Sequence, residues 1–156
     1  MDSYKLKLRI NLIILLAVLS SCSSNKTETV ISGVWTIDTI SYKNQDIIQC
    51  LGLNVLTFKK DNNCELPVVE NCNGINDYNR NGSWKIIDVK NTPVILNILS
   101  ENRIFNGKYT IKFMRDDEKK LLKMKIQSDS VYWISSKTFF DYDDNTELIN
   151  YLVQHK

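Results

Sequence analysis

The sequence predicts an all-β protein, an eight-stranded antiparallel up-and-down barrel with a short C-terminal helix. Short runs of alternating apolar and polar residues follow one another from residue 33 onward, which is the periodicity of half-buried strands. Turn-forming residues separate most of these runs, as in hairpins. Such a sheet hides its edges completely when it closes into a barrel. A sandwich of two sheets is the alternative fold, because alternation alone is compatible with both.

The predicted strands are joined mainly by tight turns. They cover residues 33–42, 55–60, 64–69, 82–89, 94–99, 107–114, 121–128 and 130–137. Asp61, Asn62 and Asn63 predict the turn after the second strand. Pro67 cannot donate a ladder hydrogen bond, so the third strand is expected to be short, bent or at an edge. A polar loop is expected over residues 70–82.

The alternation assigns one side chain of every neighbouring pair to the interior of the barrel. The expected inward-facing residues are Trp35, Ile37, Leu56, Phe58, Trp84, Ile86, Leu96, Ile98, Tyr109, Ile111, Phe113, Met124, Ile126 and Trp133. An eight-stranded barrel has an interior just wide enough for side chains or one small ligand. The sequence therefore leaves two possibilities open, a cavity or a packed core.

The end of the chain breaks the strand pattern. Asp144 and Glu147 have the spacing of a capping box, and apolar residues with helical spacing follow them. We expect one short helix near residues 145–154 on the outside of the barrel. The surrounding acidic residues are explained by helix capping and a solvated face.

The first residues have the features of a secretory signal peptide. Lys5, Lys7 and Arg9 precede an apolar run over residues 10–19, which is half the length that a membrane-spanning helix needs. The run ends in Leu19-Ser20-Ser21-Cys22, which resembles the lipobox of bacterial lipoproteins.

That resemblance implies removal of residues 1–21 and a diacylglycerol on the thiol of Cys22. Ser23 after the cysteine resembles the signal for sorting to the outer membrane of Gram-negative bacteria. Residues 22–32 are then expected to form a flexible tether, with the barrel domain and helix over residues 33–156. The protein would be anchored to the membrane by lipid without spanning it.

Removing the signal leaves seventeen basic and seventeen acidic residues, without a basic cluster. This balance argues against nucleic-acid binding. Cys50, Cys64 and Cys72 remain, and export to an oxidising compartment permits one internal disulfide. A hairpin centred on residues 61–62 places Cys50 opposite Cys72, so we predict that these two pair and that Cys64 is free.

Gly33-Val34-Trp35 at the start of the eight-strand pattern resembles the G-x-W motif of lipocalins, over roughly residues 33–137. The resemblance implies that Trp35 closes the barrel floor beneath Lys137, the basic residue at the end of the last strand. It also implies a small apolar ligand in or at the barrel mouth.

The candidate ligand-binding residues are the large aromatic side chains of the inward face, Trp35, Phe58, Trp84, Tyr109, Phe113 and Trp133. If these rings fill the interior instead, the alternative is a non-enzymatic module that binds another envelope protein through its outer face or loops.

No metal, cofactor or enzymatic activity is predicted. Residues 77–88 match a calcium-loop pattern, but Arg80 and Lys85 add positive charge and the segment leads into a strand, so an Asn- and Gly-rich turn is the preferred interpretation. His155 is the sole histidine and lies next to the C-terminus, where it is poorly placed to activate a nucleophile.

Overall fold

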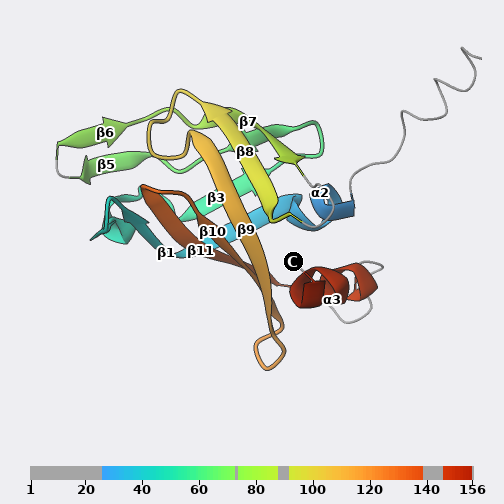
Figure 1. Cartoon of the computed structure of the whole chain (residues 1–156). Coiled ribbons are helices and arrows are strands. Elements are labelled where there is room, and N and C mark those ends of the chain that lie inside the picture. The colour runs from blue at the N-terminus through green and yellow to red at the C-terminus, as the bar shows by residue number, and fades with distance from the viewer. Residues whose placement is uncertain (1–25, 73, 88–91, 139–145, 156) are drawn as a thin grey trace, which may run out of the picture.

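A computed structural model describes residues 26–72, 74–87, 92–138 and 146–155 (Figure 1). The strands are β1 (Gly33–Tyr42), β2 (Gln45–Asp46), β3 (Val55–Phe58), β4 (Asn63–Glu65), β5 (Val69–Cys72), β6 (Ile75–Asp77), β7 (Asn81–Ile87), β8 (Val94–Ser100), β9 (Gly107–Asp116), β10 (Leu121–Gln127) and β11 (Val131–Thr138). The helical elements are α2 (Lys26–Ile31), the 3₁₀ turn η1 (Ile48–Cys50) and α3 (Thr146–His155).

Eight of the strands close into an antiparallel barrel, which confirms the predicted fold. Their order around the barrel is β1-β3-β4-β7-β8-β9-β10-β11, and β11 pairs again with β1 from Thr36↔Ser136 to Tyr42↔Val131. The β1–β11 register shifts between Ile37 and Thr39, a bulge of the kind that bends a strand. Chain neighbours are therefore barrel neighbours, as in an up-and-down barrel.

The interior of the barrel is a continuous apolar core, and every residue predicted to face inward is buried. Burial alternates along β9, where Tyr109, Ile111 and Phe113 are buried and the residues between them are exposed. Burying such side chains stabilises the fold by about 1.5–3 kcal/mol each. The alternation predicted the core because a strand turns successive side chains to opposite faces.

The prediction of a polar loop over residues 70–82 is wrong in part. β5 and β6 form a separate two-stranded sheet there, with Val69↔Asp77 and Cys72↔Ile75 as paired residues. These strands are too short and too rich in Asn for periodicity to reveal them. The predicted short third strand is confirmed, since β4 ends at Glu65 before Pro67.

The prediction of a flexible tether is wrong from residue 26 onward. Residues 26–31 form α2, and the side chains of Val30 and Ile31 are buried with the barrel core. The polar composition concealed this helix, because only its last turn carries apolar residues. The folded domain therefore begins several residues before the first strand.

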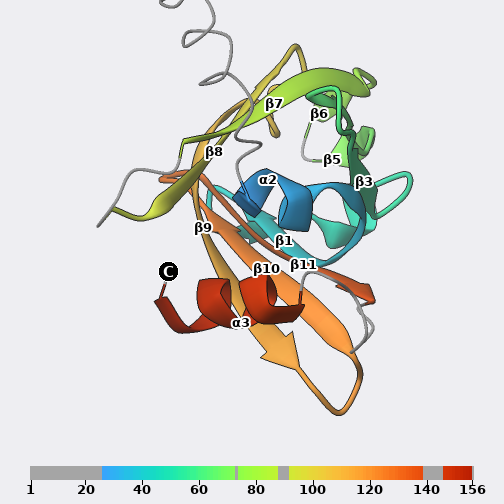
Figure 2. The same cartoon turned by 90° about the vertical axis from the view of Figure 1, so that its right-hand side faces the viewer.

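The predicted C-terminal helix is confirmed as α3, which lies beside α2 and against β9 (Figure 2). Ile149 and Leu152 of α3 are 4% and 1% exposed and belong to the same core as the barrel side chains. The helix is outside the cylinder, as expected, and it contributes to the core at one end.

Candidate functional site

The barrel has a closed end, which we call the floor, at the start of β1 and the end of β11. The indole N–H of Trp35 donates to the carbonyl oxygen of Ile31 at 2.6 Å. The ammonium of Lys137 lies 4.7 Å from the centre of the Trp35 ring, and it donates to the carbonyl oxygens of Val30 and Ser32. The contact between Lys137 and Trp35 that the lipocalin resemblance implied is thus present, and it also caps α2 with a positive charge.

The opposite end, which we call the mouth, contains a hollow of about 260 Å³. It lies between the end of β1, the turn before β9 and the β10–β11 hairpin. Its lining residues are Tyr42, Arg103, Ile104, Asn106, Gly107, Lys108, Tyr109, Ser128, Asp129, Ser130 and Val131. Polar side chains form the rim, and Tyr109 and Val131 begin the inward-facing rows of β9 and β11.

The turn before β9 is fixed by buried polar side chains. Asn102 is fully buried; its amide donates to the carbonyl oxygens of Pro67 and Asn79, and its side-chain oxygen accepts from the backbone N–H groups of Ile104 and Phe105. Asp77 accepts from the N–H of Arg103 at 2.7 Å. One wall of the mouth is thereby held in a single conformation, because these bonds satisfy groups that are costly to bury unpaired.

Below the mouth, three aromatic rings form a cluster. Trp133 contacts Tyr109 with ring centres 4.8 Å apart and Phe105 with centres 5.7 Å apart, both edge-on. The Tyr109 hydroxyl donates to the carbonyl oxygen of Ile104 at 3.2 Å, and burial raises its pKa, so it remains a neutral donor. Such ring pairs add about 0.5–1.5 kcal/mol beyond their buried area.

Two polar atoms on β11 are buried within the barrel without a hydrogen-bond partner, Trp133 Nε1 and Ser135 Oγ. Both residues are 0% exposed and stand two positions apart on the inward face of one strand. The other two indoles of the chain do have partners: Trp35 donates to Ile31, and Trp84 donates to the Lys59 carbonyl at 3.0 Å. Buried indoles usually find a partner, so Trp133 is the exception.

The six predicted ligand-binding residues are all buried, but they do not surround one pocket. Trp35 lies at the floor, Phe58 and Trp84 form a separate pair 5.1 Å apart, and Tyr109 and Trp133 belong to the mouth cluster. Phe113 is 1% exposed, on β9 opposite Met124 of β10. Tyr109 is the member that lines the mouth hollow.

Sequence reasoning missed Phe105, Asn102 and Ser135. Phe105 and Asn102 lie in a turn without strand or helix periodicity, so no pattern marks them. Ser135 could have been found, because it shares the inward parity of Trp133. A small hydroxyl residue at an inward position of an apolar barrel indicates a candidate site, because burying an unpaired hydroxyl costs free energy.

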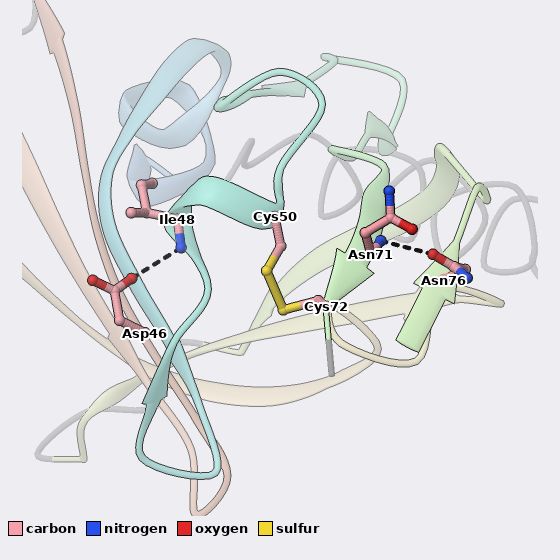
Figure 3. Close-up of a disulfide and its surroundings, with 6 residues drawn as sticks. All are labelled: Asp46, Ile48, Cys50, Asn71, Cys72 and Asn76. Atoms are coloured by element: carbon pink, nitrogen blue, oxygen red, sulfur yellow. Dashed lines mark hydrogen bonds between the residues drawn. A yellow bond between two sulfur atoms is a disulfide. The ribbon is translucent and has the colours of Figure 1, made fainter. Parts of the chain in front are cut away.

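The disulfide predicted between Cys50 and Cys72 is present, with Cα atoms 5.4 Å apart (Figure 3). It joins η1 to β5, next to the bridge between Leu51 and Val69. Cys64 is free and buried, and burial raises its pKa to about 11. Cys22, the predicted lipid-attachment residue, lies outside the described residues.

The calcium-loop pattern has a structural explanation. Both carboxylate oxygens of Asp77 accept backbone N–H groups, from Asn79 and Arg103, and β7 begins at Asn81 in the middle of the pattern. Within the described parts of the chain, His, Cys, Asp and Glu do not gather in groups that could hold a metal ion. No helix in those parts has the length and apolar character needed to cross a bilayer.

No family model, curated protein or solved structure matches the chain. The geometry identifies the protein as a small closed antiparallel barrel, with α2 bound to its floor by Trp35 and Lys137 and a hollow at its mouth. The eight-stranded barrel is consistent with a lipocalin-like fold.

Proposed function

We propose that this protein is a lipocalin-like lipoprotein of the bacterial outer membrane, anchored through a lipid on Cys22, that binds a small and mostly apolar ligand at the barrel mouth. The ligand carries at least one hydrogen-bond acceptor. The unpartnered Trp133 Nε1 and Ser135 Oγ beneath the mouth are the observation that supports this proposal most directly.

The energetics of these two atoms supports a ligand. A buried donor without a partner costs about 1–3 kcal/mol, and a fold that needed only packing would gain by having an apolar residue at position 135. The indole donates, and the hydroxyl both donates and accepts. A carbonyl, ether or hydroxyl group of a ligand would satisfy them, while the surrounding aromatic rings would contact an apolar body.

Binding at this depth requires movement of the mouth cluster. Trp133 is 0% exposed, and the rings of Tyr109 and Phe105 touch it. A ligand that enters from the mouth hollow and reaches the indole N–H has to displace one of them. The proposal therefore includes a conformational step at Phe105 or Tyr109 that precedes or accompanies binding.

Native mass spectrometry of residues 23–156, produced without the signal and the lipidated cysteine, tests the ligand. The expected result is a retained small molecule that is released by organic extraction. Ser135→Ala is expected to retain much less of it, whereas Ser136→Ala, on the neighbouring position of β11, is expected to retain as much as the unmodified domain. An empty barrel, both in this domain and in the full-length protein purified from the native envelope, would count against the proposal.

The anchor is tested separately. Replacing Cys22 by Ala is expected to abolish incorporation of labelled fatty acid and to move the protein from the membrane fraction to the soluble fraction. A Cys22→Ala protein that still incorporates label and sediments with membranes would contradict the assignment of the lipid to this sulfur.

One observation favours the second candidate, a module that binds another envelope protein. Three apolar side chains are exposed close together: Val34 on the outer face of β1 at 59%, Leu53 before β3 at 63%, and Val55 at the start of β3 at 38%. Val34 and Val55 are diagonal neighbours, because Val34 pairs with Thr57 and Thr36 pairs with Val55. Crosslinking in cells from position 53, compared with position 112 on β9, tests this surface.

A further inference from the structure

A second hollow of about 690 Å³ lies on the outer wall of the barrel and shares no lining residue with the mouth hollow. Its base is a row of outward-facing side chains across three strands, Asn63 of β4, Ser83 of β7 and Leu99 of β8, which pair in register. The segment 78–81 forms one side, and Ser100 and Glu101 close the end. We call this the β7–β8 hollow.

The hollow contains two large side chains that folding leaves in water. Tyr78 is 64% exposed and Leu99 is 58% exposed. Exposed apolar groups that are scattered singly need no explanation, but two that line the same concavity are typical of a binding site. Their rings and methyl groups offer a flat apolar surface next to polar groups.

The polar side chains of the hollow are available to a ligand. Among the described residues, the side-chain amides of Asn79 and Asn81 make no hydrogen bond, while the carbonyl of each accepts one from the fold. The Asn63 amide nitrogen donates to Asp61, which leaves its oxygen to accept. Each amide can donate and accept at once, which matches the hydrogen-bonding of hydroxyl groups.

The backbone beneath these side chains is held in place. Ser100 Oγ donates to the Asn81 carbonyl at 2.9 Å, and the buried Asn102 donates to the Asn79 carbonyl at 3.0 Å. Asp77 accepts from the Asn79 N–H. A ligand would therefore bind without the cost of ordering this segment, which favours a formed site over an adaptable loop.

We propose that the β7–β8 hollow binds a neutral oligosaccharide. The ring of Tyr78 would lie against the apolar face of a sugar ring, and the amides of Asn79, Asn81 and Asn63 would bond its hydroxyl groups. Arg80 and Glu101 are of opposite sign, so the hollow has no charge preference that would select an anionic ligand. The volume of the hollow, about 690 Å³, lies within the range of roughly 300–1,000 Å³ that is usual for ligand sites.

The test is binding of the full-length protein, purified in a detergent without a sugar head group, to an array of neutral and anionic oligosaccharides. We expect binding to one or more neutral glycans. Tyr78→Ala is expected to weaken that binding by about tenfold or more. Ile87→Ala removes another exposed apolar side chain of β7 that does not line the hollow and is the matched control, with unchanged binding.

A second variant separates recognition from folding. Asn79→Ala removes a side chain that makes no bond in the fold, so it is expected to lower glycan binding while the thermal midpoint of unfolding stays unchanged. The proposal is overturned if no neutral glycan binds, if only anionic glycans bind, or if Tyr78→Ala binds as well as the control. Because these residues do not line the mouth, the outcome is independent of the ligand proposed for Trp133 and Ser135.

Discussion

Replacing Ser135 by Ala is expected to stabilise the ligand-free protein, which is the reverse of what most buried substitutions do. The Ser135 hydroxyl is 0% exposed and has no partner, so the folded state bears its desolvation cost without a compensating hydrogen bond. That cost is about 1–3 kcal/mol, and Ala removes it while leaving almost no cavity. The expected gain corresponds to a rise of about 3 °C or more in the midpoint of thermal unfolding.

Ser136, the next residue of β11, provides a control for which the free energy of unfolding is expected to change in the opposite direction. Ser136 Oγ donates to Asp38 at 2.9 Å, so Ser136→Ala is expected to lower the free energy of unfolding by about 1 kcal/mol. Both variants are measured by urea unfolding, followed through tryptophan fluorescence, on protein that has been extracted to remove ligand. If Ser135→Ala is as destabilising as Ser136→Ala, the hydroxyl has a partner in solution, and the support for a ligand at this position is lost.

The remaining predictions concern the floor, the disulfide and the free thiol. Replacing Lys137 by Met, which keeps the length of the side chain but removes its charge, is expected to lower the free energy of unfolding by about 1–3 kcal/mol, because the carbonyls of Val30 in α2 and of Ser32 just after it lose their cationic donor. Lys125→Met, on the outer wall, is the control in the same urea assay. The double variant Cys50→Ala/Cys72→Ala is expected to have a free energy of unfolding lower by about 3 kcal/mol, because the disulfide closes a loop across 22 positions of the unfolded chain. An unchanged urea midpoint would show that the bond is not formed. Burial raises the pKa of Cys64 from 9.0 to about 11, so the contribution of the neutral thiol to stability is complete below pH 9 and is lost as the pH rises toward 11, by up to about 3 kcal/mol. Cys64→Ala is expected to show a shallower loss of stability over that range, and parallel pH profiles would contradict the assignment.

The sequence was sufficient to predict the barrel because its signal is periodic. Over residues 108–113 of β9 and 122–127 of β10, each inward residue is apolar and most outward ones are Lys or Thr, and such a pattern has one favourable arrangement in a half-buried sheet. The pairing of Cys50 with Cys72 was also predicted by counting from the turn at residues 61–62, although the β3–β4 ladder ends at Thr57↔Glu65 and the chain is held together again only at the Leu51↔Val69 bridge. Both inferences need only local geometry.

The site could not be predicted in the same way, because it depends on contacts between distant segments. Asn102 bonds to Pro67 and Asn79, and no local pattern marks an Asn as the anchor of a turn. The helix α2 is stabilised by Trp35 and Lys137 rather than by its own polar sequence. Whether Trp133 has a partner is likewise decided by the packing around it, which alternation does not describe.

The contacts of Lys137 at the floor also determine how the barrel would be oriented on a membrane. Lys137 and Trp35 hold α2 at the end of the barrel opposite Tyr42 and Val131. With acyl chains on Cys22 as proposed, the four residue steps to Lys26 reach at most about 14 Å when fully extended. The barrel axis would therefore be roughly perpendicular to the bilayer, with the floor against the lipid head groups and the mouth facing the surrounding water.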